Sequence, residues 1–397
     1  MSNFSGIDAS LISAFNGKTF GTGSGGGVTA NTLASSGTQI ISNANVWNNN
    51  DVTPDFAIGP TYTNNTFTKI VGSSQGGQFL ALKSDNTLWY WATTSTNFIT
   101  TGLTLDGTWR QYGSDTDWTD IAWGNICWLA VKGGNLMFVG NGGFRQRGDG
   151  STSTATTWVT VNSALTWVSV AANQNAAWAI TDAGHAYATG YSYSYMTGQG
   201  NTSILSTWTR EKNSLTNIVE ITMARRCAFL RNSSGDVYFT GNNGNNYAGP
   251  QITSTTDQNG PILAVNSSTN YVCAKLGQFT YHGGCHIDSA GYLRFHGEGS
   301  SYARPDNSTT DAKGASSGLQ LTSMGTGWTF YSGGTEGDTT TFYAGVAIKS
   351  GALWYGGSSS TAIKRTLGLT ENSNWVEIRS SNVNIADKYT TSYIVMG

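Results

Sequence analysis

Charged residues are scarce in this chain. Lys and Arg together number 21 and Asp and Glu 23 among 397 residues, so charged side chains make up 11% of the sequence, against about 25% in an average globular protein. The formal net charge is −2, which gives no electrostatic basis for binding nucleic acid or an anionic membrane. Because exposed helix positions usually hold Glu, Lys and Ala, this scarcity also disfavours a helical protein.

Proline, cysteine and long apolar runs are scarce as well. There are 5 prolines and 4 cysteines, and the cysteines (Cys127, Cys227, Cys273 and Cys285) are too scattered to predict a disulfide framework. No run of about 18 apolar residues is present, so no membrane insertion is expected. Asp8 falls where a secretory signal would be apolar, so no such signal is expected.

Glycine, aromatic residues and small polar residues are abundant. Gly accounts for 51 residues and aromatic residues for 12% of the chain. The polar positions hold mostly Ser, Thr and Asn, which suit turns and strand surfaces better than helices. This composition predicts an all-β protein.

A strand–turn–strand unit repeats six times along the chain. In each copy a short apolar strand ends in a polar residue, a tight turn follows, and a second strand ends in Gly or Ala. The turns contain Asn86, Gly134, Gly184, Gly235, Gly291 and Gly351. The copies recur roughly every 50 residues, a period typical of propeller blades.

A second apolar landmark accompanies the units and occurs seven times, at residues 67–70, 118–121, 167–170, 218–221, 262–265, 328–331 and 375–378. The seventh unit reaches Gly397 without its last strand, and residues 38–47 could supply it. Pairing the chain ends would leave no exposed sheet edge. We therefore expect residues 38–397 to form a seven-bladed β-propeller of four-stranded blades, closed by pairing the N-terminal strand with the C-terminal blade. Extra sequence at 298–327 is expected to form a loop.

The units resemble those of the regulator-of-chromosome-condensation family. Residues 235–241 match its Gly-x-Val-Tyr-x-Trp-Gly pattern, and residues 146–150 are similar to its Gln-Leu-Gly-x-Gly pattern. The family tryptophan is replaced here by Val139, Thr189, Thr240 and His296, which indicates a remote member. The resemblance implies a seven-bladed ring. It also implies protein binding, because the family includes an exchange factor for a small GTPase and a β-lactamase inhibitor.

Residues 1–37 follow neither landmark. An apolar segment is followed by the glycine-rich stretch 21–27, which is typical of a flexible linker. The segment resembles the short leader of bacteriophage virion proteins, and its candidate docking residues are Ile7, Leu11, Ile12, Phe15, Asn16 and Gly17. We expect a virion docking segment that folds on its partner. The alternative is a terminus packed on the propeller.

These features predict a structural protein of a phage virion, in its tail, fibre or capsid surface. It would be present in several copies, bind other virion proteins through the leader, and contact a host surface molecule through the ring. One alternative is a regulator or inhibitor of the same fold that binds another protein. Another is a propeller that binds or cleaves carbohydrate. Tyr191, Tyr193 and Tyr195 are candidates for the partner surface, unless they face the neighbouring blade.

Sequence features that could carry chemistry favour structural interpretations. His282, Cys285, His286 and His296 form a cluster that could hold a soft metal. Adjacent strand residues point to opposite faces, however, and Cys285 aligns with Cys127 and Cys227 as a core position. Paired carboxylates for glycoside hydrolysis could come from Asp115, Asp117, Asp120, Glu298 and Glu336. Acidic loop residues are usually solvated, and no nucleophile or phosphate-binding motif is present.

Two further patterns resemble binding motifs but are explained by the chain's own linker and repeat. Residues 21–26 fit the glycine pattern of a dinucleotide site but have no strand before them, no helix after them and no acidic residue at the required distance. The adhesion tripeptide at residues 147–149 falls where the repeat places its turn glycines. We expect no enzyme, no cofactor and no metal.

Overall fold

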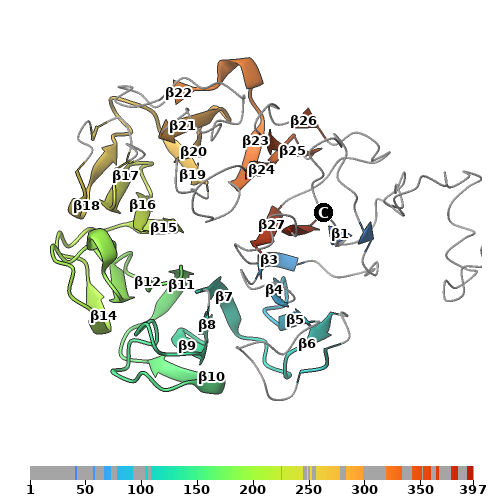
Figure 1. Cartoon of the computed structure of the whole chain (residues 1–397), viewed down its shortest axis with the longest axis vertical. Coiled ribbons are helices and arrows are strands. Elements are labelled where there is room, and N and C mark those ends of the chain that lie inside the picture. The colour runs from blue at the N-terminus through green and yellow to red at the C-terminus, as the bar shows by residue number, and fades with distance from the viewer. Residues whose placement is uncertain are drawn as a thin grey trace, which may run out of the picture.

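The computed structural model describes residues 41–42, 57–58, 67–72, 78–92, 103–105, 109–124, 126–224, 226–244, 248, 251–252, 256–277, 283–297, 319–332, 342–350, 352–358, 364–365, 377–382 and 391–396. Within these residues the chain is all-β apart from two short 3-10 helices. Figure 1 shows the sheets following one another around a ring. No helix in the described part is long and apolar enough to cross a bilayer.

The described strands include six four-stranded antiparallel sheets, each built from four strands that follow one another in the chain. We call these sheets blades 1 to 6. Blades 1 to 3 contain β3 (Phe67–Gly72), β4 (Gln78–Lys83), β5 (Leu88–Ala92) and β6 (Arg110–Gln111); β7 (Trp118–Trp123), β8 (Cys127–Lys132), β9 (Asn135–Gly140) and β10 (Ala155–Asn162); and β11 (Trp167–Ala172), β12 (Ala176–Thr181), β13 (Ala186–Gly190) and β14 (Leu205–Arg210).

Blades 4 to 6 repeat this order of strands. They contain β15 (Ile218–Ala224), β16 (Cys227–Asn232), β17 (Val237–Gly241) and β18 (Gln258–Val265); β19 (Cys273–Leu276), β20 (Gly283–Asp288), β21 (Leu293–Gly297) and β22 (Leu319–Gln320); and β23 (Trp328–Ser332), β24 (Phe342–Lys349), β25 (Ala352–Ser358) and β26 (Lys364–Arg365). The helices are η1 (Tyr193–Tyr195) and η2 (Thr322–Met324). β22 and η2 lie in the stretch predicted as a loop.

Four more strands form two smaller sheets. β1 (Ile41–Ser42) pairs with β2 (Ala57–Ile58), and β27 (Glu377–Asn382) pairs with β28 (Thr391–Met396). β27 lies against β3 of blade 1 (Figure 1) and β24 of blade 6, and β1 lies beside β28. The prediction of a propeller with four-stranded antiparallel blades is therefore confirmed. The described strands complete six such sheets rather than the predicted seven.

The repeated strand–turn–strand units predicted from the sequence are the second and third strands of the blades. The apolar landmark lies on the first strand in blades 1 to 4 and in blade 6, but not in blade 5. Residues 262–265 belong to β18, the outermost strand of blade 4, where Ile262 pairs with Phe239. The first strand of blade 5 is β19 instead, which begins at Cys273. β18 carries the apolar pattern at its end, whereas β19 begins at Cys273 rather than at an aromatic residue or Ile.

The first strands pack side by side around the centre of the ring, since β7 contacts both β3 and β11, and β15 contacts β11 and β19. Pairing with the second strand shifts in register after the first residue in all six blades. The side chains at these bulges are exposed: Thr68, Thr119, Val168, Val219, Ala274 and Thr329. A bulge increases local twist and re-aims the residues that follow it.

Each of blades 2 to 6 is joined to the blade before it by the same backbone hydrogen bond. The first N–H of the first strand donates to the carbonyl of the turn residue in the preceding blade. The donor and acceptor pairs are Trp118–Asn86 (3.1 Å), Trp167–Gly134 (2.9 Å), Ile218–Gly184 (3.0 Å), Cys273–Gly235 (3.1 Å) and Trp328–Gly291 (3.1 Å). All five turn residues have positive φ, between 60° and 85°. The predicted turn positions therefore also join the blades.

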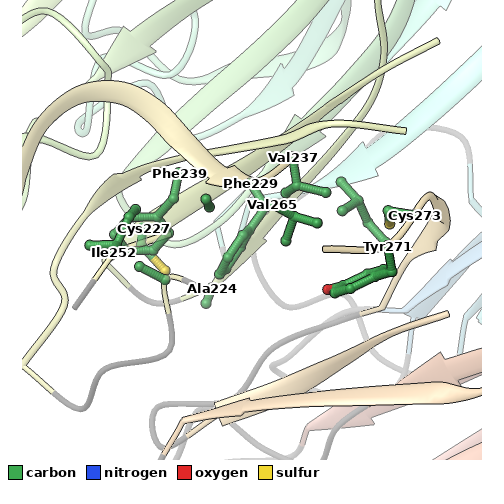
Figure 2. Packing of buried hydrophobic residues seen from close by; sticks show 12 residues of the cluster. Ala224, Cys227, Phe229, Val237, Phe239, Ile252, Val265, Tyr271 and Cys273 are labelled. Atoms are coloured by element: carbon green, nitrogen blue, oxygen red, sulfur yellow. The ribbon is translucent and has the colours of Figure 1, made fainter. Parts of the chain in front are cut away.

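The hydrophobic cores lie between blades. Between blades 4 and 5, for example, Phe229 and Val237 of one blade form a cluster with Tyr271 and Cys273 of the other (Figure 2). Equivalent clusters join blade 1 to blade 2, blade 2 to blade 3, and blade 3 to blade 4. Because each core needs side chains from two sheets, a blade cannot bury its apolar surface alone.

The turn glycines offer a direct test of this junction. An Ala side chain at Gly184 (φ +74°) would lie 2.9 Å from the backbone N and Cα of Asn217 in the next blade, whereas Gly150 (φ +83°) has open space around it. We expect Gly184→Ala to destabilise the protein by about 2–5 kcal/mol, through left-handed strain and backbone overlap. Gly150→Ala should cost about 1–2 kcal/mol, through strain alone. Urea unfolding measures both, and equal losses would contradict the proposed junction.

Candidate interaction surface

The ring has two faces, which carry different connections. The turns between second and third strands lie at the end where the first strands begin, and we call this the turn face. The loops after the third strands leave from the opposite ends of the antiparallel strands, on what we call the loop face. The tyrosines predicted to meet a partner belong to the loop face of blade 3.

Three aromatic side chains form one cluster on the loop face. The rings of Tyr191 and Tyr193 are stacked, with centroids 5.9 Å apart and planes at 23°. Phe144, from the loop of blade 2, packs edge-on against Tyr191 at 5.5 Å and 77°. Tyr193 remains 48% exposed. We call Phe144, Tyr191 and Tyr193 the aromatic cluster. It is supported by two blades and offers a large amphipathic surface with few rotatable bonds.

The third predicted tyrosine has a different environment. Tyr195 has φ 66° and its carbonyl accepts a 2.9 Å hydrogen bond from the Thr240 hydroxyl of blade 4. The same bond joins the preceding pair of blades, where the Thr189 hydroxyl donates to the carbonyl of Arg145 (φ 63°) at 3.0 Å. The backbone of Tyr195 is thus part of a repeated junction. Threonine, at the position of the family tryptophan, provides the donor.

The adhesion tripeptide is folded on itself. Arg147 Nε and Asp149 Oδ2 are 2.6 Å apart, which pairs the two charged side chains with each other. Gly148 has φ +70°, and a Cβ there would overlap the indole of Trp208. These contacts agree with the interpretation of residues 147–149 as a repeat turn.

The candidate catalytic carboxylate Asp120 is built into the centre of the ring. It is 6% exposed, is paired with Lys69 of blade 1, and accepts hydrogen bonds from the Ser169 hydroxyl (2.7 Å) and the Val170 N–H (2.8 Å) of blade 3. Glu220, at the equivalent position of blade 4, pairs with Arg231 (2.7 Å) and accepts from the Leu276 N–H of blade 5 (3.1 Å). Both carboxylates therefore join neighbouring first strands.

The other candidate carboxylates give no support for a catalytic pair. Asp115 and Asp117 are exposed and lie 3.5 Å and 3.4 Å from the ammonium of Lys132. Their environment is that of solvated surface groups, as expected for acidic loop residues. Glu298 and Glu336 lie outside the described residues.

The histidines and the cysteine of the candidate metal site do not lie in one place. His286 and His296 approach each other, with ring centroids 4.8 Å apart. Cys285 instead belongs to the cluster between blades 5 and 6, and His282 lies outside the described residues. Among the residues that the structure describes, no three His, Cys, Asp or Glu side chains are grouped to hold a metal ion.

The predicted alignment of the cysteines was wrong by two residues. Cys127 pairs with Gly140 and Cys227 with Gly241, at the start of their strands. Cys285 pairs with Phe295, because β20 begins two residues earlier, at Gly283. A shift of two keeps the side chain on the same face of the sheet. All four cysteines are free and buried, and burial raises the pKa of the Cys127 and Cys273 thiols above the usual value.

Sheets of four antiparallel strands arranged around a centre, with cores between consecutive sheets, define a β-propeller. No known family matches the sequence, and no curated protein matches it. Solved structures do match the fold. The chain is similar to human WBSCR16, with 14% identity and a TM-score of 0.64 over 91% of this chain and 99% of that one.

A second similar structure is Prp20p of Saccharomyces cerevisiae. It has 12% identity and a TM-score of 0.66, over 92% of each chain. The same yeast protein, described as yeast RCC1 and bound to Kap60, matches with a TM-score of 0.64 over 92% of this chain and 90% of that one. These similarities place the chain among proteins with the RCC1-like propeller fold, as the repeat resemblance predicted. At such low identity they establish the fold and no function.

The role of Asp120 can be tested by substitution. Asp120→Ala would leave the Val170 N–H without this acceptor, so we expect a loss of about 1–3 kcal/mol in the free energy of unfolding. Asp120→Asn keeps an amide oxygen that can accept the bond and should cost less. Asp182→Ala, at an exposed position on the turn face, is the control and should be nearly neutral. If Asp120→Ala unfolds at the same urea concentration as the control, Asp120 does not join the blades.

Proposed function

We propose that the chain is a protein-binding propeller and not an enzyme. The observation that carries the proposal is the aromatic cluster, in which exposed Tyr193 is stacked on Tyr191 and supported by Phe144 of another blade. Rigid aromatic side chains at a surface are typical of protein-binding sites. The buried carboxylate Asp120, by contrast, is engaged in contacts between blades.

The similar structures support a protein as the class of partner. Prp20p has binding properties toward Gsp1p and histones, and in the second structure of this yeast protein it is bound to Kap60. With 21 basic and 23 acidic residues, the present chain has no charge excess to attract a highly charged partner. We therefore propose recognition through aromatic and hydrogen-bonding contacts on the loop face.

We also propose that the ring has seven blades. The seventh would combine β27 and β28 from the carboxyl end with β1 and β2 from the amino end. Supporting this arrangement, β27 lies against blades 6 and 1, and β1 lies beside β28. The sequence agrees, since Glu377 follows Trp375 by two residues, as Asp120 follows Trp118. Joining the chain ends within one sheet would close the ring.

The biological setting that we propose is a phage virion. In this proposal the leader residues Ile7, Leu11, Ile12, Phe15, Asn16 and Gly17 attach several copies to other virion proteins, and the loop face contacts a host surface molecule. The leader lies outside the described residues, so its support comes from the sequence alone: an apolar segment joined by a glycine-rich linker to a ring with few charges. If the protein is instead a regulator or inhibitor, it would bind its partner through the same loop face without being part of a virion.

Substitution of the exposed tyrosines tests the loop face. Tyr191→Ser/Tyr193→Ser removes two rings of the aromatic cluster, and we expect at least a tenfold loss of affinity for the partner, in the range of interface hot spots. The immobilised full-length protein is used to retain partner proteins from a lysate and from a cell-envelope fraction of the host cells. Mass spectrometry then identifies the retained proteins. Tyr292→Ser, on the turn face, is the matched control. A partner retained equally by all three proteins would contradict binding at the aromatic cluster.

Removal of residues 1–27 tests the leader. We expect the shortened protein to fold with an unchanged urea midpoint, because in this proposal the leader folds on its partner and not on the ring, and to be absent from purified particles. Quantitative immunoblotting of particles measures incorporation. Retained incorporation would remove the docking hypothesis. A lowered urea midpoint would favour the alternative in which the leader packs on the ring.

A further inference from the structure

Two histidines interrupt the repeat at a single interface, that between blades 4 and 5. His286 lies opposite the fourth residue of its first strand. The equivalent residues of the other blades are all apolar: Ala81, Ala130, Ala179, Leu230 and Ala347. His296 precedes the last glycine of β21, where blades 2 to 4 have Val139, Thr189 and Thr240. Both differences from the repeat place an imidazole in the same inter-blade core.

Both imidazoles are buried and in contact. His286 is 0% and His296 2% exposed, and their ring centroids are 4.8 Å apart. His286 also packs edge-on against Phe229 of blade 4, at 5.4 Å. The hydroxyl of Tyr271 lies 2.7 Å from Nε2 of His296, and Figure 2 shows Tyr271 near Phe229 and Val237 of blade 4. This group therefore lies between the two blades.

The charged groups around the pair offer it little compensation for a positive charge. The Arg294 guanidinium lies 4.9 Å from the ring centre of Tyr271 and is paired with Asp288 at 2.7 Å. Arg231 of β16 is paired with Glu220 of β15. The nearby thiols of Cys273 and Cys285 are buried. Among the residues that the structure describes, the neighbouring carboxylates Asp288 and Glu220 are each paired with an arginine, so protonation would place an additional charge in a core.

We propose that the interface between blades 4 and 5 is an acid-sensitive latch: neutral His286 and His296 keep it closed, and protonation of either histidine opens it before the other interfaces. Opening would separate β16 from β20 while the remaining blades stay folded. This inference concerns regulation of the ring and holds whatever partner the loop face binds. In a binding protein it would make the spacing of the loops dependent on pH.

The pH range follows from the direction of the pKa shifts. Burial, and then the nearby Arg294, lowers the pKa of His296 to about 3, and burial together with His296 and Arg231 holds that of His286 well below its usual range. Above about pH 7.5 the histidines are almost entirely neutral in both states, so closure is fully favoured. Below this pH the open state binds protons that the closed state does not. Closure then weakens by up to tenfold per pH unit for each histidine, until the closed-state pKa is reached.

Hydrogen–deuterium exchange of the full-length protein from pH 7.5 to 4.5 tests the latch, after correction for the intrinsic pH dependence of exchange. We expect protection of β16 and β20 peptides to fall at least tenfold more than that of β8 and β12 peptides, which flank the interface between blades 2 and 3. Equal changes in protection at the two interfaces would overturn the proposal. This measurement requires no variant.

A double variant tests the two histidines themselves. His286→Ala/His296→Thr introduces residues that other blades already have at these positions, so the variant should fold and keep its protection at pH 4.5. His185→Ala, a half-buried histidine of blade 3, is the control and should remain acid-sensitive like the original protein. Acid-induced exchange of β16 and β20 that persists in the double variant would contradict the latch.

Discussion

One backbone hydrogen bond determines how blades 2 to 6 of this protein follow the blades before them. It runs from the first N–H of the first strand to a turn carbonyl of the preceding blade. The carbonyl points toward the next blade because its residue has a left-handed backbone, as at Gly184 and Gly235. Glycine adopts that conformation without steric cost. Side chains add further hydrogen bonds between the blades, away from the turns. They are the carboxylates of Asp120 and Glu220 and the hydroxyls of Thr189 and Thr240.

This arrangement separates residues that build the ring from residues available for binding. The chain can build this ring with few charged residues, because charged groups near the centre are used in pairs. Asp120 is paired across two blades and Glu220 within one blade. On the loop face, the exposed ring of Tyr193 lies in the aromatic cluster and is available for contact with a partner. A ring held together in this way can vary its loops without altering its cores, which explains how one fold supports different binding activities.

Much of the fold could be predicted from the sequence because each blade repeats its own local signals. The turn residues, the hairpins and the buried first residues such as Trp167 follow from glycine spacing and apolar pattern. The first strand of blade 5 was missed because Cys273 lacks that pattern and Ile262 imitates it. The sequence singled out Tyr191 and Tyr193 but not Phe144, since that contact joins two blades across 47 residues of sequence. The roles of Asp120 and His286 likewise depend on neighbouring blades.

An experimental density map of the full-length protein, at a resolution that shows backbone carbonyls, would test the account most directly. The account predicts seven sheets, with β1 hydrogen-bonded beside β28. The first-strand amide of Trp375 should also donate to the turn carbonyl of blade 6, as the amides of Trp118 and Trp167 donate to the turns of their preceding blades. A ring of six sheets, or a β1 strand paired away from the carboxyl end, would contradict it.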